Sequence, residues 1–199
     1  MSDQQHWDAA YAKTPEQLSW TQSEPTRSLA LISEAAPTGR VIDIGGGDSR
    51  LAELLLDRGY QPTVLDISPK AIERAQAHLG DRAAQVNWIV GDITADLALG
   101  SFDIWHDRAT FHFLTEPAQR AVYIATLLRS LKTGGHAILA TFAPDGPEKC
   151  SGLPVCRYDG ESLARELGSR LQRIKTVPEL HHTPWGAPQS FQYSLFRRI

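Results

Sequence analysis

Three aspartates each lie in or directly after a short hydrophobic run with the composition of a buried β-strand: Asp43, Asp66 and Asp92. The first is followed by the glycine run Gly45-Gly46-Gly47. Consecutive glycines stabilise neither a strand nor a helix, so they indicate a turn that needs positive φ or close backbone approach. Carboxylates around such a turn repel a pyrophosphate and suit a cation. The pattern therefore predicts a site for a positively charged, nucleotide-like ligand.

The glycine turn is expected to join a strand over 41–44 to a helix over 49–58, because leucines recur at helical spacing after it. A strand, a bare turn and a helix N-terminus form a nucleotide site in an open α/β sheet. The dinucleotide fingerprint requires a third glycine where this chain has Arg50. An NAD-dependent oxidoreductase is therefore disfavoured but remains a rival, which calorimetry against both cofactors would settle.

The elements that position these residues alternate along the chain. Strands are expected at 41–44, 62–67, 86–90, 102–106, 136–142, 171–177 and 191–197, and helices at 25–36, 49–58, 69–79, 117–131 and 160–167. The glycines at 133–135 are expected to form a turn, 143–158 to be irregular, and a Pro/His-rich loop to separate the last two strands. This order predicts an α/β fold: a doubly wound, Rossmann-like, seven-stranded and mostly parallel sheet, with helices on both faces and the last strand antiparallel.

Length and charge limit the function classes. The 199 residues, 42% hydrophobic, predict a single domain over 1–199, in which the arm and helix at 1–36 form a lid. The net charge of -3 argues against nucleic-acid binding. No apolar run approaches the ~20 residues of a membrane span. With only Cys150 and Cys156, the chain has no disulfide framework, so a cytoplasmic protein is expected, a monomer or weak dimer acting on a small molecule.

Four motifs resemble those of the class I S-adenosylmethionine (SAM) methyltransferases: Asp43-x-Gly45-x-Gly47, Asp66, Gly91-Asp92 and Thr133-Gly134-Gly135. The resemblance implies a transferase that uses SAM and releases S-adenosyl-L-homocysteine. It implies that Asp92 meets the adenine amino group and that Ile93 packs on the ring. Asp66, at the end of the second strand, is placed to accept hydrogen bonds from both ribose hydroxyls. Ile67 supplies an apolar wall to the adenine or ribose.

A narrower similarity is to the thiopurine, thiol and halide methyltransferases. An aromatic N-terminal arm ends in Leu18-Ser19-Trp20, and His106-Asp107-Arg108-Ala109 resembles the group's Trp-Asp-Arg-Gly/Ala stretch. The group's Gly-Pro-Pro acceptor loop corresponds to 146–155, where Leu153 replaces the first proline. The similarity implies a small nucleophilic acceptor, with sulfur favoured over nitrogen or oxygen.

The residues after the fourth strand are the candidates for catalysis. His106 or Asp107 is expected to accept a proton from the acceptor, and Arg108 to hold a thiolate or carboxylate. His106 is also expected beside the cofactor. Trp20 is expected to cover the methionine part of the cofactor, because aromatic faces attract a sulfonium. The structural alternatives are an Asp107–Arg108 ion pair and a plain packing anchor at Trp20.

Several alternatives stay open. The Asp-Lys/Arg-Gly/Ala-Thr element of some protein-lysine methyltransferases matches 107–110 equally well. A non-catalytic SAM binder is a further rival. The two cysteines are candidate soft ligands for arsenite. No metal site is expected, because the histidines at 106, 112, 181 and 182 lack metal-ligand spacing.

Overall fold

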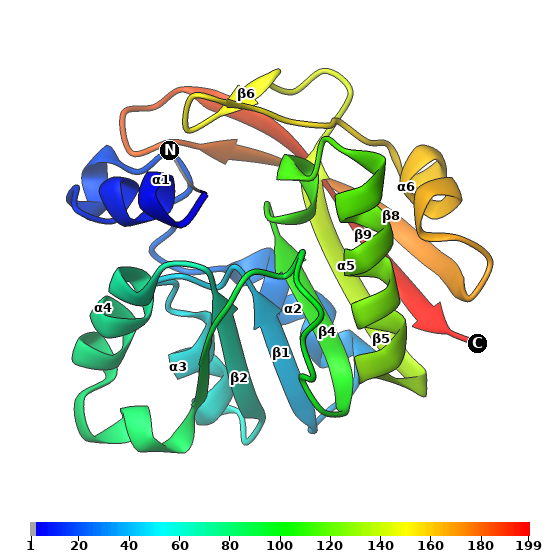
Figure 1. Cartoon of the computed structure of the whole chain (residues 1–199), viewed down its shortest axis with the longest axis horizontal. Helices are drawn as coiled ribbons and strands as arrows, with labels where there is room; N and C mark the ends of the chain where they lie inside the picture. The colour runs from blue at the N-terminus through cyan, green and yellow to red at the C-terminus, as the bar shows by residue number, and fades with distance from the viewer. Residues whose placement is uncertain (1–2) are drawn as a thin grey trace.

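The computed structural model describes residues 3–199, and its core is a seven-stranded sheet with the order β3-β2-β1-β4-β5-β9-β8 (Figure 1). Its strands are β1 (Arg40–Ile44), β2 (Gln61–Asp66), β3 (Asn87–Val90), β4 (Phe102–Arg108), β5 (Leu131–Phe142), β8 (Leu171–His182) and β9 (Pro188–Arg198). A small hairpin is formed by β6 (Lys149–Cys150) and β7 (Leu153–Pro154). The first five sheet strands are parallel and β9 is antiparallel to both its neighbours, which confirms the expected fold class.

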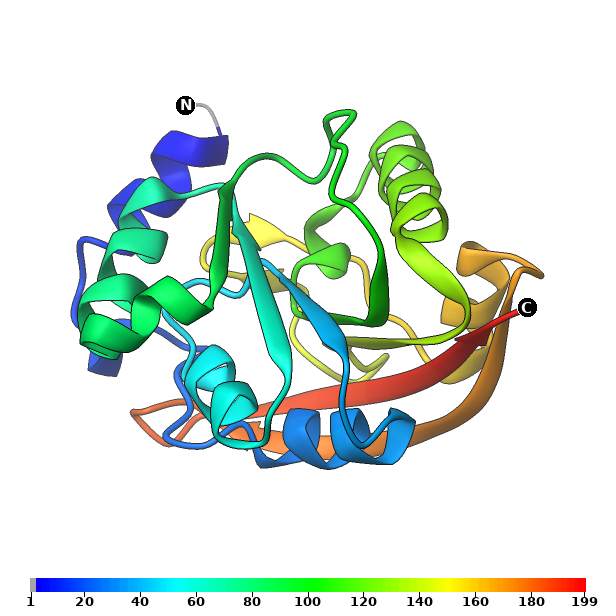
Figure 2. The same cartoon turned by 90° about the horizontal axis from the view of Figure 1, so that it is seen from below.

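The helices are α1 (Asp3–Ala10), α2 (Thr26–Ala35), α3 (Leu51–Asp57), α4 (Pro69–Leu79), α5 (Pro117–Ser130) and α6 (Gly160–Leu167), with 3-10 turns at Pro15–Gln17, Gly80–Gln85 and Phe111–Phe113. Because alternate strand residues point to opposite faces, Ile42 and Trp105 pack with α5 and α6, whereas Val41 and Ile104 pack with α2 and α3. Figure 2 shows the blue α2 and cyan α3 below the sheet and the yellow-green α5 above it.

The strand order reverses between β1 and β4. The chain runs outward from β1 through β2 to β3 and then returns to pair β4 with the other side of β1. In such sheets, ligands bind beyond the carboxyl ends of the strands at this point. The glycine turn and the residues after β4 therefore meet at one edge of the sheet.

The glycines at 133–135 do not form the expected turn, because β5 begins at Leu131 and runs through them. The pairing with β4 shifts register between Phe102 and Ile104, and Gly134 has φ +81°. The glycine therefore serves a bulge that keeps the two strands paired.

The C-terminal hairpin is longer than expected, since β8 and β9 are paired from Leu171 to His182. Only residues 183–187 connect them, so much of the expected Pro/His-rich loop is strand. Backbone pairing in the hairpin overrides the local composition, and β8 tolerates Pro178 because it is an edge strand.

The N-terminal arm also contains a helix that the sequence reading did not predict. Its helix α1 lies beside α4 (Figure 1), and Ser68, which caps α4, donates a hydrogen bond of 2.6 Å to Asp8. Met1 and Ser2, the first residues of the expected lid, lie outside the described residues.

Candidate functional site

A cavity of about 830 Å³ opens at the carboxyl ends of β1, β2, β3 and β4. The N-terminal arm and the β6–β7 hairpin supply its other walls. The cavity contains nine of the ten residues expected to bind the cofactor: Trp20, Asp43, Gly45, Gly46, Asp66, Ile67, Asp92, Ile93 and His106. The tenth, Gly47, contacts the site through its backbone N–H, which donates to Asp66.

Two buried carboxylates lie at the tips of β1 and β2. Asp43 is 4% exposed and Asp66 is 5% exposed. Asp66 accepts a hydrogen bond of 2.8 Å from the Ser68 N–H, yet burial raises its pKa to about 7. Asp48 lies beside the glycine turn and pairs with Arg74 at 2.7 Å. Carboxylates in this setting favour a ligand that brings positive charge and hydroxyl donors.

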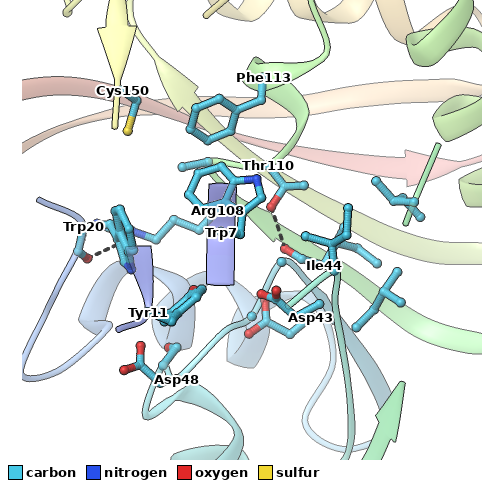
Figure 3. Close-up of a pocket in the computed structure, with 18 of the residues that line it drawn as sticks. Trp7, Tyr11, Trp20, Asp43, Ile44, Asp48, Arg108, Thr110, Phe113 and Cys150 are labelled. Carbon is cyan, nitrogen blue, oxygen red and sulfur yellow. Dashed lines mark hydrogen bonds between the residues drawn. The ribbon is translucent and has the colours of Figure 1, made fainter. Parts of the chain in front are cut away.

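The glycine turn is shaped by contacts that leave no room for side chains. Gly45 and Gly47 have φ of +63° and +52°. A β-carbon on Gly45 would lie 2.0 Å from the Thr110 hydroxyl oxygen, and one on Gly47 would lie 2.0 Å from the Tyr11 hydroxyl oxygen. The Thr110 hydroxyl also donates to the Ile44 carbonyl at 3.0 Å (Figure 3). Only glycines permit this close approach of backbone and neighbouring groups.

The far end of the cavity is formed after β3. Asp92 accepts hydrogen bonds of 2.8 Å and 2.7 Å from the N–H and hydroxyl of Thr94. Ile93 is buried in the core beside it, and Ile67 lies on the same cavity wall. Asp92 is thus an acid between apolar side chains, and its contact with an adenine ring stays a prediction.

His106 occupies the switch point itself. It pairs in register with Asp43 across β4 and β1. Its Nδ1 lies 2.7 Å from a carboxylate oxygen of Asp43, and its Nε2 lies 2.9 Å from the hydroxyl oxygen of Ser28 on α2. Both ring nitrogens are therefore held by side chains that also border the cavity.

Asp107 is not among the residues that border the cavity. Its carboxylate accepts hydrogen bonds from the N–H groups of Thr110 and Phe111, at 2.9 Å and 3.1 Å, and from the Tyr123 hydroxyl at 2.6 Å. Burial raises its pKa to about 6. These contacts hold the turn after β4 against α5, and Asp107 makes no ion pair with Arg108.

Arg108 borders the cavity from the same face of β4 as His106. Its Nε donates to the Tyr193 hydroxyl at 3.1 Å, and its Nη1 donates to the Trp20 carbonyl at 3.0 Å (Figure 3). Its guanidinium lies 5.3 Å from the centre of the Phe191 ring. Its Nη2 is buried and has no hydrogen-bond partner among residues 3–199. Arg108 therefore brings an uncompensated positive charge to this wall.

Aromatic side chains from the N-terminal arm also border the cavity, close to Arg108 (Figure 3). The Trp7 ring lies 5.0 Å from that of Phe113 and 5.9 Å from that of Trp20. The Tyr11 ring is also 5.9 Å from Trp20. The sequence reading noted an aromatic arm but assigned a role to Trp20 alone. The enrichment of aromatics in an otherwise polar stretch was the available signal.

The arm is fastened on two sides. Arg74 of α4 donates to the carbonyls of Tyr11 and Lys13 at 2.8 Å and 2.9 Å. On the other side, Nε2 of His181 in β8 lies 2.7 Å from the Ser19 carbonyl oxygen. The arm thus bridges α4 and the C-terminal hairpin across the cavity.

Residues 3–199 contain no group of three or more metal-ligating side chains, and none of their helices has the length and apolar composition to cross a membrane. Both cysteines are free thiols. Cys150 borders the cavity, and burial raises its pKa. Cys156 packs in the other core cluster, with its sulfur toward the Leu114 carbonyl.

Comparison with known proteins agrees with this geometry. A family model described as a methyltransferase domain matches residues 41–135. The malonyl-[acyl-carrier protein] O-methyltransferase of Anoxybacillus flavithermus is 33% identical over 108 residues, which are 53% of this chain and 40% of that protein. The chain thus spans less than half of that relative's length.

Two solved structures share the fold over nearly the whole chain. The N-methyltransferase NodS of Bradyrhizobium japonicum, in complex with S-adenosyl-L-homocysteine, has a TM-score of 0.77 at 18% identity, covering 98% of this chain and 97% of NodS. A structure from work on the conversion of a disulfide bond into a thioacetal group during echinomycin biosynthesis has a TM-score of 0.81 at 20% identity, covering 99% and 92% of the two chains. The buried carboxylates and the glycine turn fit SAM, and the family match identifies a methyltransferase domain over residues 41–135 of this chain.

Proposed function

We propose that this protein transfers the methyl group of SAM to a small acceptor that reacts as an anion, with a thiol as the favoured class. The observation that carries this proposal is which arginines of the cavity wall have a carboxylate partner and which do not. Arg50 pairs with Glu53 and Arg74 pairs with Asp48. Arg108 has no carboxylate partner among residues 3–199, and its Nη2 is unsatisfied. Arg108 is half-buried, and a cation in that setting without a counter-ion is costly, so an anionic ligand lowers that cost.

The cofactor supplies a methyl group on a positively charged sulfur. Asp66 is placed to accept its ribose hydroxyls, and Asp92 and Ile93 to hold its adenine. Asp43 and the glycine turn surround the remaining, positively charged portion. These residues orient the ligand, while the chemistry requires mainly that the acceptor atom be held in line with the methyl group.

The acceptor half of the cavity has the character that a thiol requires. Trp7, Trp20 and Phe113 offer apolar faces to the acceptor's body. Arg108 stabilises the negative charge that sulfur carries as it attacks, because charge-assisted contacts are strong in a water-poor site. A lysine ammonium is unsuited to a wall that carries Arg108, which argues against a protein-lysine acceptor. The fold itself is known to host N-methylation in NodS.

We also assign residues 3–36 the role of a lid. Trp7, Tyr11 and Trp20 cover the cavity from the arm, and tertiary contacts hold the arm there, among them hydrogen bonds from α4, β4 and β8. A closed lid excludes water and keeps the sulfonium next to aromatic faces. The protein is then expected to act as a monomer or weak dimer, since the cavity is complete within one chain.

The test is release of S-adenosyl-L-homocysteine from SAM with a panel of arenethiols, alkanethiols, phenols and anilines. The wild-type protein is expected to turn over thiols fastest. Arg108→Gln is expected to raise the KM for thiols or lower kcat by about 100-fold, the effect of losing one electrostatic stabiliser. The control is Arg82→Gln, which removes an exposed arginine that pairs with Asp57 at 2.6 Å. Equal activity of both variants, or turnover of amines alone, would contradict the proposal.

A further inference from the structure

Three polar side chains from three different elements form an unbroken hydrogen-bonded line beside the cavity. Asp43 of β1 lies 2.7 Å from Nδ1 of His106 on β4, and Nε2 of His106 lies 2.9 Å from the Ser28 hydroxyl on α2. Their exposed fractions are 4%, 2% and 1%, and all three border the cavity. The line therefore borders the cavity beside the paired tips of β1 and β4.

The hydrogen-bonded line continues to Arg108, whose Nη2 has no hydrogen-bond partner among residues 3–199. The hydroxyls of Ser28 and Tyr193 are hydrogen-bonded to each other, and the Tyr193 hydroxyl accepts from Nε of Arg108 at 3.1 Å. Asp43, at the cofactor end, and Arg108, at the acceptor end, are thus joined through His106, Ser28 and Tyr193. A fully connected polar network of this kind has a defined direction for proton movement.

The fold does not require this line. In many proteins, replacement of buried polar or ionic groups by apolar groups of similar volume is neutral or stabilising. His106 also has no free nitrogen for an acceptor, because Asp43 and Ser28 occupy both. A neutral imidazole that donates from Nδ1 to Asp43 accepts at Nε2 from the Ser28 hydroxyl. Any proton that reaches His106 from the cavity must therefore pass through Ser28.

We propose that Ser28 takes the proton of a protonated acceptor and passes its own proton to His106 during methyl transfer, an inference that rests on the proposed function. The acceptor's S–H bond breaks, and its proton forms a new bond to the Ser28 oxygen as the Ser28 proton moves to Nε2. The acceptor's electron pair forms the bond to the methyl carbon. The electron pair of the old carbon–sulfur bond stays on the cofactor's sulfur. The positive charge lost there reappears on His106, where Asp43 stabilises it.

The surroundings of His106 suit this role. Asp43 is the carboxylate in contact with the ring, from β1. On β4 itself, Asp107 points to the other face of the sheet and Arg108 is hydrogen-bonded to Tyr193. From β5 the register partner is the apolar Ile138, and α2 presents the neutral Ser28. Asp43 is thus the one carboxylate hydrogen-bonded to the ring among residues 3–199.

The test compares two acceptors: an alkanethiol that is protonated at pH 7.5 and an arenethiol that is already ionised. Ser28→Ala is expected to lower kcat for the protonated thiol by about 100-fold, the usual contribution of a general base. It should leave kcat for the ionised thiol and the Kd of SAM unchanged within about threefold. Ser28→Thr, which keeps the hydroxyl, should restore most of the loss. Ser130→Ala is the control, since it removes another buried serine hydroxyl, at the end of α5.

The pH profile gives a readout that a structural role would not move. For the protonated thiol, the kcat/KM of the wild-type protein is expected to exceed that of His106→Asn most at pH values well below the pKa of the free thiol, where the acceptor must lose its proton on the enzyme. Equal losses for both thiols in Ser28→Ala would overturn the relay while leaving the proposed function intact. Failure of the wild-type protein to methylate any thiol would overturn both.

An independent measurement needs no turnover. In a long-range ¹H–¹⁵N spectrum at pH 7.5, with the signal assigned by comparison with His106→Asn, Nδ1 is expected to carry a proton and Nε2 to carry none. A ring already protonated at both nitrogens is unable to accept from Ser28 and would overturn the proposal. In Ser28→Ala the Nε2 signal should shift, because its hydrogen-bond donor is lost.

Discussion

The hydroxyl of Tyr11 lies so close to the α-carbon of Gly47 that a methyl group on Gly47 would be 2.0 Å from the Tyr11 oxygen. This contact joins the N-terminal arm directly to the cofactor turn. The position of the arm and the shape of the turn therefore depend on each other.

Gly47→Ala is accordingly expected to displace Tyr11 and weaken SAM binding by at least about tenfold, roughly the 1.4 kcal/mol that a tenfold change represents. Gly80→Ala is the matched control. Its φ is +56°, against +52° for Gly47, and a β-carbon there has nothing within 4 Å. Both positions have positive φ, so both variants carry backbone strain, and calorimetric titration with SAM compares a glycine in contact with Tyr11 with a glycine that has no neighbour at the added β-carbon. Similar loss of affinity in both variants would argue against the coupling.

Substitution of Asp66 is expected to have opposite effects on SAM binding and on the free energy of unfolding. Burial raises its pKa to about 7 from 3.8, so the folded protein holds a proton that the unfolded chain releases. This group therefore makes the protein less stable as the pH rises from about 4 to about 7, with no further loss above. Asp66→Asn should raise the free energy of unfolding at pH 8 by at most about 4 kcal/mol, at 1.36 kcal/mol per pKa unit.

The same substitution should abolish SAM binding, and the wild-type affinity should fall below pH 7 as the carboxylate is protonated. Denaturant titrations at pH 5.5 and 8, with calorimetry at the same values, check both statements. Because burial also raises the pKa of Asp107, only the difference between wild type and Asp66→Asn is informative for stability. A variant that binds SAM as the wild type does would show that Asp66 does not hold the ribose.

Trp20 is expected to contribute to SAM binding through its ring. Trp20→Ala should raise the Kd of SAM about 3- to 30-fold, the equivalent of a cation–π contact of about 0.5–2 kcal/mol. It should affect S-adenosyl-L-homocysteine less, because that product lacks the sulfonium charge. Trp185→Ala is the control, since Trp185 lies in the β8–β9 loop and is 59% exposed. Equal effects on the two cofactor forms would reduce Trp20 to a packing anchor.

Ala109 has φ +69°, a left-handed conformation that costs a non-glycine residue about 1–2 kcal/mol. Ala109→Gly should relieve that cost and, after the extra entropy of glycine in the unfolded chain, raise the stability by about 0.5–1 kcal/mol. Ala121→Gly, at an exposed position inside α5, should instead lower it by about 1 kcal/mol. Urea unfolding of both variants checks the sign. Destabilisation by Ala109→Gly would show that its methyl group packs favourably in the turn.

The sequence predicts where a helix or strand begins and ends when residues of that element itself determine its ends. Helix α4 begins at Pro69 after the Ser68 cap and ends before Gly80, as expected. The turn expected at the glycines 133–135 was wrong because these residues belong to β5, which pairs with β4. Local composition does not reveal that neighbour. The α1 helix was missed for a similar reason, since α4 and the cavity hold it in place.

Strand ends account for the candidate residues that lie together at the cavity. Asp43, Asp66 and Asp92 reach the cavity because parallel strands end at the same edge of the sheet. The placement of Asp107 follows from strand geometry: alternate residues face opposite sides, so His106 and Arg108 share the cavity side. Ser28, Trp7 and Tyr11 come from segments whose position depends on tertiary packing, and no motif marks them.

The double fastening of the arm, by Arg74 on α4 and by His181 on β8, has a kinetic consequence. With the arm in the proposed role of a lid, a ligand as large as SAM would enter past Trp7, Tyr11 and Trp20, and at least one of these two contacts would open beforehand. Association is then a two-step process in which the observed rate constant levels off at high ligand concentration, at the opening rate of the arm. Substitutions that weaken the contact with Arg74 or the contact with His181 should speed exchange of the cofactor. Where release of the product limits turnover, kcat should rise as well.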